Sequence, residues 1–152
     1  MQTAHFVIEI SRGSLIKWGS NGRIDFVSPI PCPFNYGSIP TTLGADGDPL
    51  DVVVLGPRRS RNTTGSLPVR ACARFVDRGH RDDKWICSPH PLRRRDRLLL
   101  RAFFNLYALP KNTKSMLMHR RRCRFLGLDE HVDDFASPHT AMDHSLSVGT
   151  NR

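Results

Sequence analysis

The chain contains 152 residues, of which 39% are hydrophobic and 24% charged, and its formal net charge is +9. A chain of this length suits one compact domain with a single core. No stretch approaches the roughly 18 consecutive apolar residues of a transmembrane helix, and the N-terminus lacks the pattern of a secretory signal. We therefore expect no membrane segment and residence in the cytoplasm.

The cysteines and arginines argue against two further classes of protein. The four cysteines include no Cys-x-x-Cys pair, so neither a zinc site nor a disulfide framework is predicted. Much of the positive charge comes from arginine clusters at residues 58–61, 93–95 and 120–122. These clusters are far apart in the sequence, lack interleaved aromatic residues and match no nucleic-acid-binding motif. Solvated basic faces are therefore favoured over a specific nucleic-acid site.

Six short strands are predicted in the first part of the chain, where β-branched and aromatic residues are bounded by turn residues. Their ranges are 6–10, 15–18, 24–27, 52–55, 69–76 and 84–87. Glycine, proline and asparagine punctuate the intervening segments. This pattern favours short antiparallel strands in a closed or partly closed barrel.

An amphipathic helix is predicted over residues 96–109. Apolar residues recur there at a spacing of three to four, namely Leu99, Phe103, Leu106 and Tyr107. Pro110 should end the helix, because proline lacks a backbone donor and disfavours the helical conformation of the preceding residue. Beyond Gly127 the apolar periodicity fades, so we expect one domain over residues 1–128 and a flexible C-terminal tail over residues 129–152.

Three aspartates, Asp46, Asp48 and Asp51, stand immediately before or at the start of an apolar strand. In an extended chain Asp46 and Asp48 point the same way, and Gly47 between them lets the backbone approach closely. Carboxylates about 5 Å apart repel by roughly 3 kcal/mol at an effective dielectric near 20, so their convergence requires a cation or raised pKa values. Taken alone, the Asp-Gly-Asp-Pro segment is more typical of a polar turn than of a metal site.

A second acidic loop, residues 77–84, also leads into an apolar strand, and the two loops could converge across the mouth of a barrel. An EF-hand is excluded, because its diagnostic sixth and twelfth positions, counted from Asp46, hold Asp51 and Pro57. Oxygen ligands without a nearby histidine or cysteine pair favour hard cations. Magnesium is the expected ion, with manganese as a possible substitute.

The segment Asp46-Gly47-Asp48-Pro49-Leu50-Asp51-Val52 resembles the signature of the soluble, family I inorganic pyrophosphatases. Further segments agree in order, namely Ile8-Glu9-Ile10 with Lys17, Asn35-Tyr36-Gly37, Asp77 to Lys84, and Phe103-Phe104 to Tyr107. The resemblance covers roughly residues 5 to 114 and implies a mainly β fold with flanking helices (α+β), built on a small closed five-stranded barrel of OB type. It also implies magnesium-dependent hydrolysis of pyrophosphate to two phosphates by a homo-oligomer, usually a hexamer in bacterial members.

The resemblance assigns roles to eleven residues. The implied metal residues are Asp46, Asp51, Asp77, Asp82 and, through bound water, Glu9. Asp48 would be the general base. The implied phosphate-binding residues are Lys17, Arg23, Tyr36, Lys84 and Tyr107.

Four positions depart from the family pattern, namely Gly19, Cys32, Arg78 and Ala108. They affect outer contacts to metal and phosphate, whereas the inner carboxylates are retained. The sequence therefore favours a divergent pyrophosphatase of reduced activity. Two alternatives stay open, a non-catalytic phosphate or polyanion-binding protein on the same fold and a hydrolase of a different phosphoanhydride.

Overall fold

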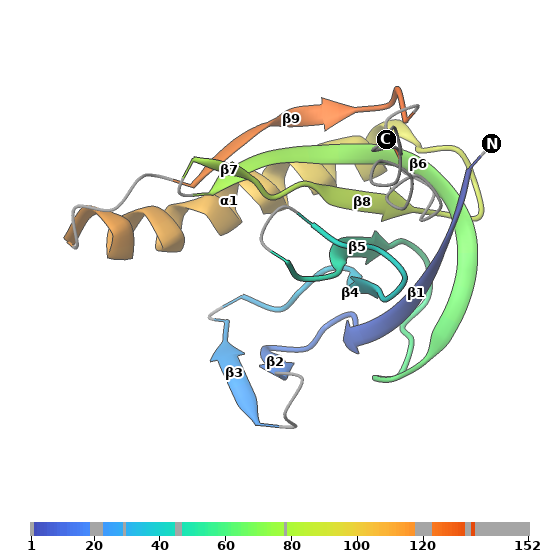
Figure 1. Cartoon of the computed structure of the whole chain (residues 1–152), viewed down its shortest axis with the longest axis horizontal. Coiled ribbons are helices and arrows are strands. Elements are labelled where there is room, and N and C mark those ends of the chain that lie inside the picture. The colour runs from blue at the N-terminus through green and yellow to red at the C-terminus, as the bar shows by residue number, and fades with distance from the viewer. Residues whose placement is uncertain are drawn as a thin grey trace, which may run out of the picture.

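The computed structural model describes residues 2–18, 23–28, 30–44, 47–77, 79–117, 123–132 and 135. Within these ranges the chain forms nine β-strands and one α-helix (Figure 1). The strands are β1 Thr3–Ile10, β2 Ile16–Trp18, β3 Ile24–Val27, β4 Asn35–Ile39, β5 Leu50–Val54, β6 Thr64–Asp77, β7 His80–Arg81, β8 Lys84–Cys87 and β9 Arg124–Asp129. The helix is α1 Arg94–Leu117.

Five of the strands close into a ring. β1 pairs with β4 on one side and with β6 on the other, so the order β1-β4-β5-β8-β6 returns to its start. β5 and β8 run parallel, and all other neighbours in the ring are antiparallel. The predicted mainly β class with a closed five-stranded sheet is confirmed, although one helix flanks the ring in the described part of the chain where several were expected.

The strand β6 is the longest element of the sheet and curves around the ring (Figure 1). Its first residues, Thr64–Pro68, pair with β1, whereas later residues pair with β8 and β9. The end of β6 forms a hairpin with β7, in which Asp77 lies opposite His80. This one strand therefore connects the N-terminal strand to the acidic loop at residues 77–84.

Two apolar clusters cover the opposite faces of the ring. Because successive side chains of a strand point to opposite faces, Val52 and Val54 belong to one cluster and Val53 to the other. The cluster that contains Val52 and Val54 is called the inner core, and it draws buried residues from all five ring strands. The cluster that contains Val53 is called the outer core. It also contains Leu100 and Phe104 of α1 and therefore lies between the ring and the helix.

The buried face of α1 differs from the predicted face by one residue. Leu100 and Phe104 are buried, whereas Leu99 and Leu106 are 46% and 43% exposed. Apolar residues occur in three triplets along this helix, 98–100, 102–104 and 106–108. Several faces therefore share the same spacing, and only packing against the sheet selects one of them.

The predicted end of the helix is also wrong, because α1 continues through Pro110 to Leu117. Proline removes one backbone hydrogen bond from a helix, but a helix can absorb this local loss in a bend. The residue preference before proline is a statistical tendency and does not by itself terminate a helix.

Three strands fall outside the predicted ranges, β4, β7 and β9. β4 contains Gly37, where an added Cβ would collide with the carbonyl of Val7 on β1, so the close approach of the two strands requires glycine. Because glycine usually indicates a turn in a sequence, this strand was not predicted. β7 has only two residues, and β9 contains Gly127 with a φ of 139°. Rules based on β-branched and aromatic runs miss such strands.

Of the predicted tail, the structure describes residues 129–132 and Phe135. The ring of Phe135 contacts that of Trp85 at a centroid distance of 4.9 Å, and both side chains are buried. Glu130 accepts two hydrogen bonds from Arg97 of α1. The domain boundary at residue 128 and a flexible tail stay predictions. Among the described helical residues, none forms a span long and apolar enough to cross a bilayer.

Leu100→Ala tests the buried face of α1. The substitution leaves a void in the outer core and should lower the free energy of unfolding by about 2–5 kcal/mol, whereas Leu126→Ala, at a leucine more than half exposed, should cost less than about 1 kcal/mol. Urea denaturation followed by circular dichroism measures both values. Equal losses in the two variants would contradict the packing described here.

Candidate active site

The two acidic segments meet at Lys84. Asp51 lies opposite Lys84 in the parallel pairing of β5 with β8, and Asp82 precedes Lys84 by two residues. The Lys84 Nζ atom donates to Asp51 Oδ2 and to Asp82 Oδ1, each at 2.5 Å. The lysine side chain is only 3% exposed, whereas those of Asp51 and Asp82 are 29% and 23% exposed. Two carboxylates reachable from solvent therefore share one buried cation.

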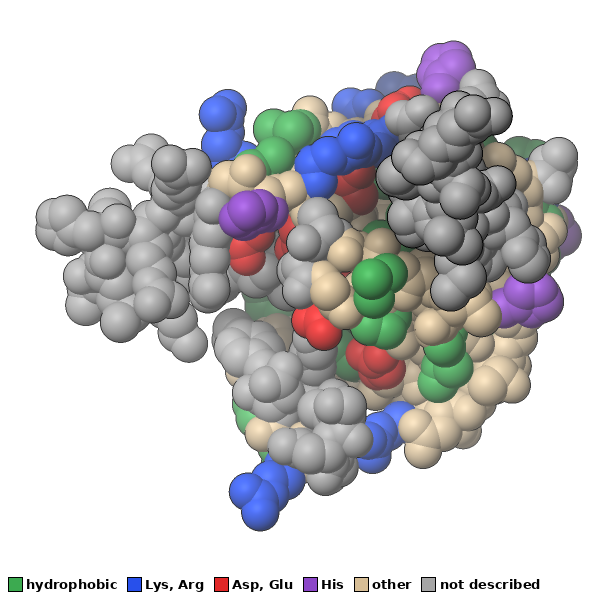
Figure 2. All heavy atoms as spheres, in the orientation of Figure 1, with side chains coloured by type: hydrophobic (Ala, Val, Ile, Leu, Met, Phe, Trp, Pro, Cys, Tyr) green, Lys and Arg blue, Asp and Glu red, His purple; other side chains and the backbone are tan. Residues whose placement is uncertain are grey.

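This centre lies on the outer face of the ring. Along their strands, Asp51 has the same orientation as Val53, and Lys84 the same orientation as Ile86, and both of those residues belong to the outer core. The Lys84 Nζ atom is 5.9 Å from the centroid of the Phe75 ring. Acidic side chains gather over the middle of the face that carries β5, β7 and β8 (Figure 2).

The ion pairs decide the charge state of Lys84. Burial opposes the ammonium form, but the negative charges of Asp51 and Asp82 and their hydrogen bonds outweigh this effect, so the pKa of Lys84 is raised above its ordinary value. Lys84 is therefore charged at neutral pH and offsets the repulsion between the two carboxylates.

The other predicted metal and base residues lie on different elements and differ in exposure. Asp77 ends β6, and Glu9 is half-buried where the register between β1 and β4 shifts. Asp48 is exposed in a turn in which Gly44 N donates to Asp48 O at 2.7 Å and Gly47 has a φ of 88°. Among the described residues, no three acidic, histidine or cysteine side chains converge as a metal site, and Asp46 lies outside the described ranges.

The predicted phosphate-binding residues are only partly described. Tyr36 is half-buried on β4 and packs against the outer core, and Arg23 is exposed just before β3. The side chains of Lys17 and Tyr107 lie outside the described part of the chain. Among the departures from the family pattern, Cys32 and Ala108 are buried, whereas Gly19 and Arg78 lie outside the described residues.

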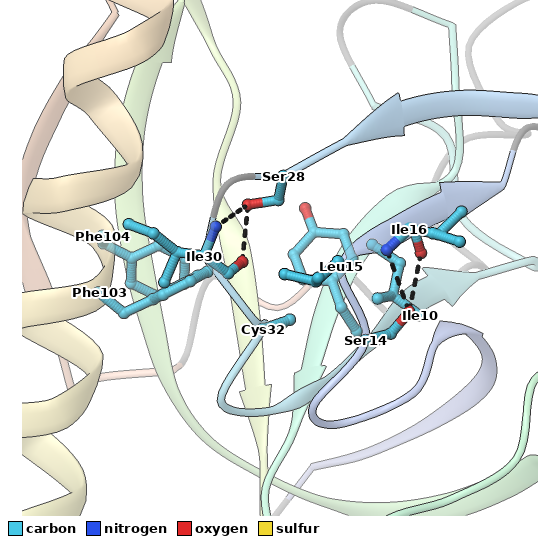
Figure 3. A pocket seen from close by; sticks show the side chains of 10 residues that line it. Ile10, Ser14, Leu15, Ile16, Ser28, Ile30, Cys32, Phe103 and Phe104 are labelled. Carbon is cyan, nitrogen blue, oxygen red and sulfur yellow. Dashed lines mark hydrogen bonds between the residues drawn. The ribbon is translucent and has the colours of Figure 1, made fainter.

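A separate cavity of about 60 Å³ lies between the β2–β3 hairpin and α1. Figure 3 shows Phe103 and Phe104 on one side of it and Ser14, Leu15 and Ile16 on another. Its lining is mostly apolar and includes Tyr36 and Cys32. Burial raises the pKa of the Cys32 thiol, which is therefore neutral. The residues that line this cavity include no charged side chain, so the cavity offers a polyanion no cationic donor.

Sequence reasoning gave no role to Asp83, which lies between Asp82 and Lys84. Its carboxylate accepts hydrogen bonds from Phe75, Arg74 and Arg81. The sequence shows two adjacent aspartates but not which one faces the lysine, because two partners of Asp83, Arg74 and Phe75, lie on β6.

Lys84→Met tests the central ion pairs through the pH dependence of stability. A folded-state pKa above the unfolded value gives stability that is complete below the unfolded pKa of about 10.4 and is lost as pH rises through the folded pKa. The free energy of unfolding of the wild type should therefore fall more steeply above about pH 10.4 than that of Lys84→Met. At pH 7 the variant should be less stable by about 1–3 kcal/mol, since water screens both carboxylates in part.

Urea denaturation in chelator over pH 7 to about 11.5 measures both effects. Identical alkaline slopes would show that Lys84 does not carry the raised pKa.

Comparison with known proteins identifies the family. The family model of inorganic pyrophosphatase matches residues 6–122. An inorganic pyrophosphatase of Gluconobacter oxydans is 35% identical over 127 residues, which cover 74% of this chain and 68% of that protein. A soluble inorganic pyrophosphatase of Solanum tuberosum is 31% identical, with coverage of 90% and 67%.

The fold agrees with this match. The structure of an inorganic pyrophosphatase from Coxiella burnetii superposes with a TM-score of 0.66 at 23% identity and covers 85% of this chain and 86% of that chain. This similarity bears on the fold, and it confirms the predicted OB-type class of a closed five-stranded sheet. Because the family model spans most of the sequence and extends across both acidic segments, the chain belongs to the inorganic pyrophosphatase family.

Proposed function

We propose that the chain hydrolyses inorganic pyrophosphate to two phosphates with magnesium as the cofactor and manganese as a possible substitute. The observation that carries the proposal is the convergence of Asp51 and Asp82 on one cationic atom, in a chain that the pyrophosphatase family model matches over residues 6–122. Family membership supports the hydrolase over a non-catalytic polyanion-binding protein.

The donor set fits a hard divalent cation. Asp51 and Asp82 direct carboxylate oxygens at the same point, and both are partly exposed, so an ion can reach them from solvent. Oxygen donors of this kind suit magnesium. Asp46, Asp77 and Glu9 would complete the set. A bound ion would acidify water and neutralise charge on the phosphate oxygens.

Lys84 would have two roles. In the structure its ammonium group supplies the positive charge between Asp51 and Asp82. A divalent ion held by those carboxylates would replace this charge, and the ammonium would then be available to a phosphate oxygen. Charge-assisted hydrogen bonds from Lys84, Lys17 and Arg23, with hydroxyl groups of Tyr36 and Tyr107, would bind the substrate.

Asp48 would act as the general base. It is exposed, and the turn that carries it is fixed by the bond from Gly44 N to Asp48 O. An exposed carboxylate can accept a proton from the attacking water and release it to solvent.

Magnesium-dependent phosphate release, with and without chelator, is the direct test of this function. Asp51→Asn should abolish turnover, because it replaces one of the two carboxylates proposed to hold magnesium with a neutral amide. Asp48→Asn should keep magnesium binding but lower turnover about 10²–10⁴-fold, the usual loss for a general base. Phosphate assays and magnesium calorimetry on the three proteins separate these outcomes.

Full turnover by Asp51→Asn would end the proposed metal site. Loss of magnesium affinity in Asp48→Asn would make Asp48 a ligand. Wild-type protein that binds pyrophosphate but releases no phosphate with any divalent ion would favour the non-catalytic alternative.

We also propose that the protein is a cytoplasmic homo-oligomer, with a hexamer as the family expectation. The four cysteines are buried thiols, as is usual in a reducing compartment. Leu98, Leu99 and Leu106 are exposed on the outward side of α1, and an apolar strip of this kind suits contact with another copy.

Leu98→Glu with Leu99→Glu tests the assembly. If this strip is an interface, the wild type should show a mass several times the 17.2 kDa of one chain, and the double variant should dissociate because burying the new carboxylates is costly. Sedimentation analysis measures both masses, with Leu126→Glu on β9 as the control. A wild-type mass of one chain would refute the oligomer without affecting the proposed hydrolysis.

A further inference from the structure

The side chain of Asp83 is 10% exposed and accepts hydrogen bonds from three residues. Its Oδ1 atom accepts from Phe75 N at 3.0 Å. Its Oδ2 atom accepts from Arg74 Nη1 at 3.0 Å and from Arg81 Nη2 and Nε at 2.7 and 3.1 Å. A carboxylate with both oxygens engaged by N–H donors is a structural anchor, since removing it leaves buried donors without a partner.

The contacts of Asp83 fix the loop between β6 and β8. Phe75 of β6 is held twice, by Asp83 at its N–H and by Asp82 N, which donates to Phe75 O at 3.0 Å. The pairing of β6 with β9 shifts register between Arg74 and Phe75, so the side chain of Asp83 binds at an irregular point of the ladder. The backbone that carries Asp82 and Lys84 is thereby tied to one residue of β6.

Asp83 points away from the proposed metal site. Its neighbours Asp82 and Lys84 contact each other, and Lys84 also contacts Asp51, whereas Asp83 contacts Arg74 and Phe75. Asp83 therefore does not act as a ligand beside Asp51. It can act only through the placement of the residues on either side.

Arg74 extends this anchor to the strand β9. Its guanidinium contacts Asp83 on one side and Asp129 Oδ2 on the other, through Nη2 at 2.9 Å and Nε at 3.3 Å. The Arg74 group also lies 5.9 Å from the centroid of the Trp85 ring. The hydrogen bond from Arg74 holds the pKa of Asp129 below its usual value, because it stabilises the charged carboxylate.

We propose that Asp83 is a positioning residue that sets Asp82 and Lys84 against Asp51, and that Arg74 couples this placement to Asp129 of β9. The proposal rests on the proposed function only in that the site is taken to bind magnesium. Residues that orient metal ligands from behind commonly change metal affinity or activity 10–100-fold when they are replaced.

Magnesium calorimetry and pyrophosphate hydrolysis on Asp83→Ala and Asp83→Asn test the proposal. Asp83→Ala should weaken magnesium binding about 10-fold or more and lower kcat, with a smaller change in KM, at a temperature where circular dichroism shows it folded. Asp83→Asn keeps an acceptor for Phe75 N and should recover part of the affinity. Asp129→Asn should shift magnesium affinity in the same direction by a smaller factor.

Glu130→Gln is the matched control. It removes the carboxylate charge next to Asp129 in sequence and breaks the exposed ion pair of Glu130 with Arg97, which does not involve the loop between β6 and β8. It should leave magnesium affinity and kcat within about twofold of wild type. If Asp83→Ala fails to fold, Asp83→Asn and Asp129→Asn decide. Wild-type magnesium affinity in those two variants would overturn the inference.

The outcomes also separate this inference from the proposed function. A wild type that hydrolyses pyrophosphate, with Asp83 variants that match it, would refute only the positioning role. A wild type that binds magnesium but releases no phosphate would refute the hydrolysis. The magnesium affinities of the Asp83 variants, measured by calorimetry, would still test the positioning role. A wild type that does not bind magnesium would overturn both.

Discussion

The geometry of the acidic centre depends on one buried ammonium group held between two carboxylates. Lys84 starts β8, Asp51 lies on the adjacent strand β5, and Asp82 belongs to the loop that enters β8. The parallel pairing of β5 with β8 sets Asp51 and Lys84 at the same level, and the whole of β6 intervenes between those strands in sequence. Ring topology therefore brings together two acidic segments that local sequence leaves apart.

The position of this centre at the boundary between core and solvent is chemically useful. Lys84 is desolvated on the side of the outer core, where electrostatic interactions are strong, whereas its carboxylate partners face water. An ion can therefore reach the carboxylates without opening the fold. The apolar cavity beside Tyr36 shows the contrast, since residues of the same core line part of it but its lining contains no charged group.

Sequence reasoning predicted the elements whose signal is local and missed those set by tertiary contact. The strands at residues 24–27 and 84–87 have the predicted bounds, because each is a short segment rich in β-branched and aromatic residues. The burial of Leu100 in place of Leu99 depends on which face meets the sheet. In the candidate site, the family resemblance named Asp51, Asp82 and Lys84 but did not predict the contact of the lysine with both carboxylates. Asp83 was missed because Arg74 and Phe75 of β6 meet it only in the folded chain.

Closure of the ring also has a consequence for the time course of folding. The pairing of β1 with β6, such as Phe6 opposite Gly65, joins segments roughly 60 residues apart, and contacts of such separation slow folding because loop entropy must be lost first. During synthesis, Asp51 leaves the ribosome well before Lys84 and Asp82. The contact of Asp51 with Lys84 can therefore form only after β6 and β8 have been synthesised, so the acidic centre forms late in chain assembly.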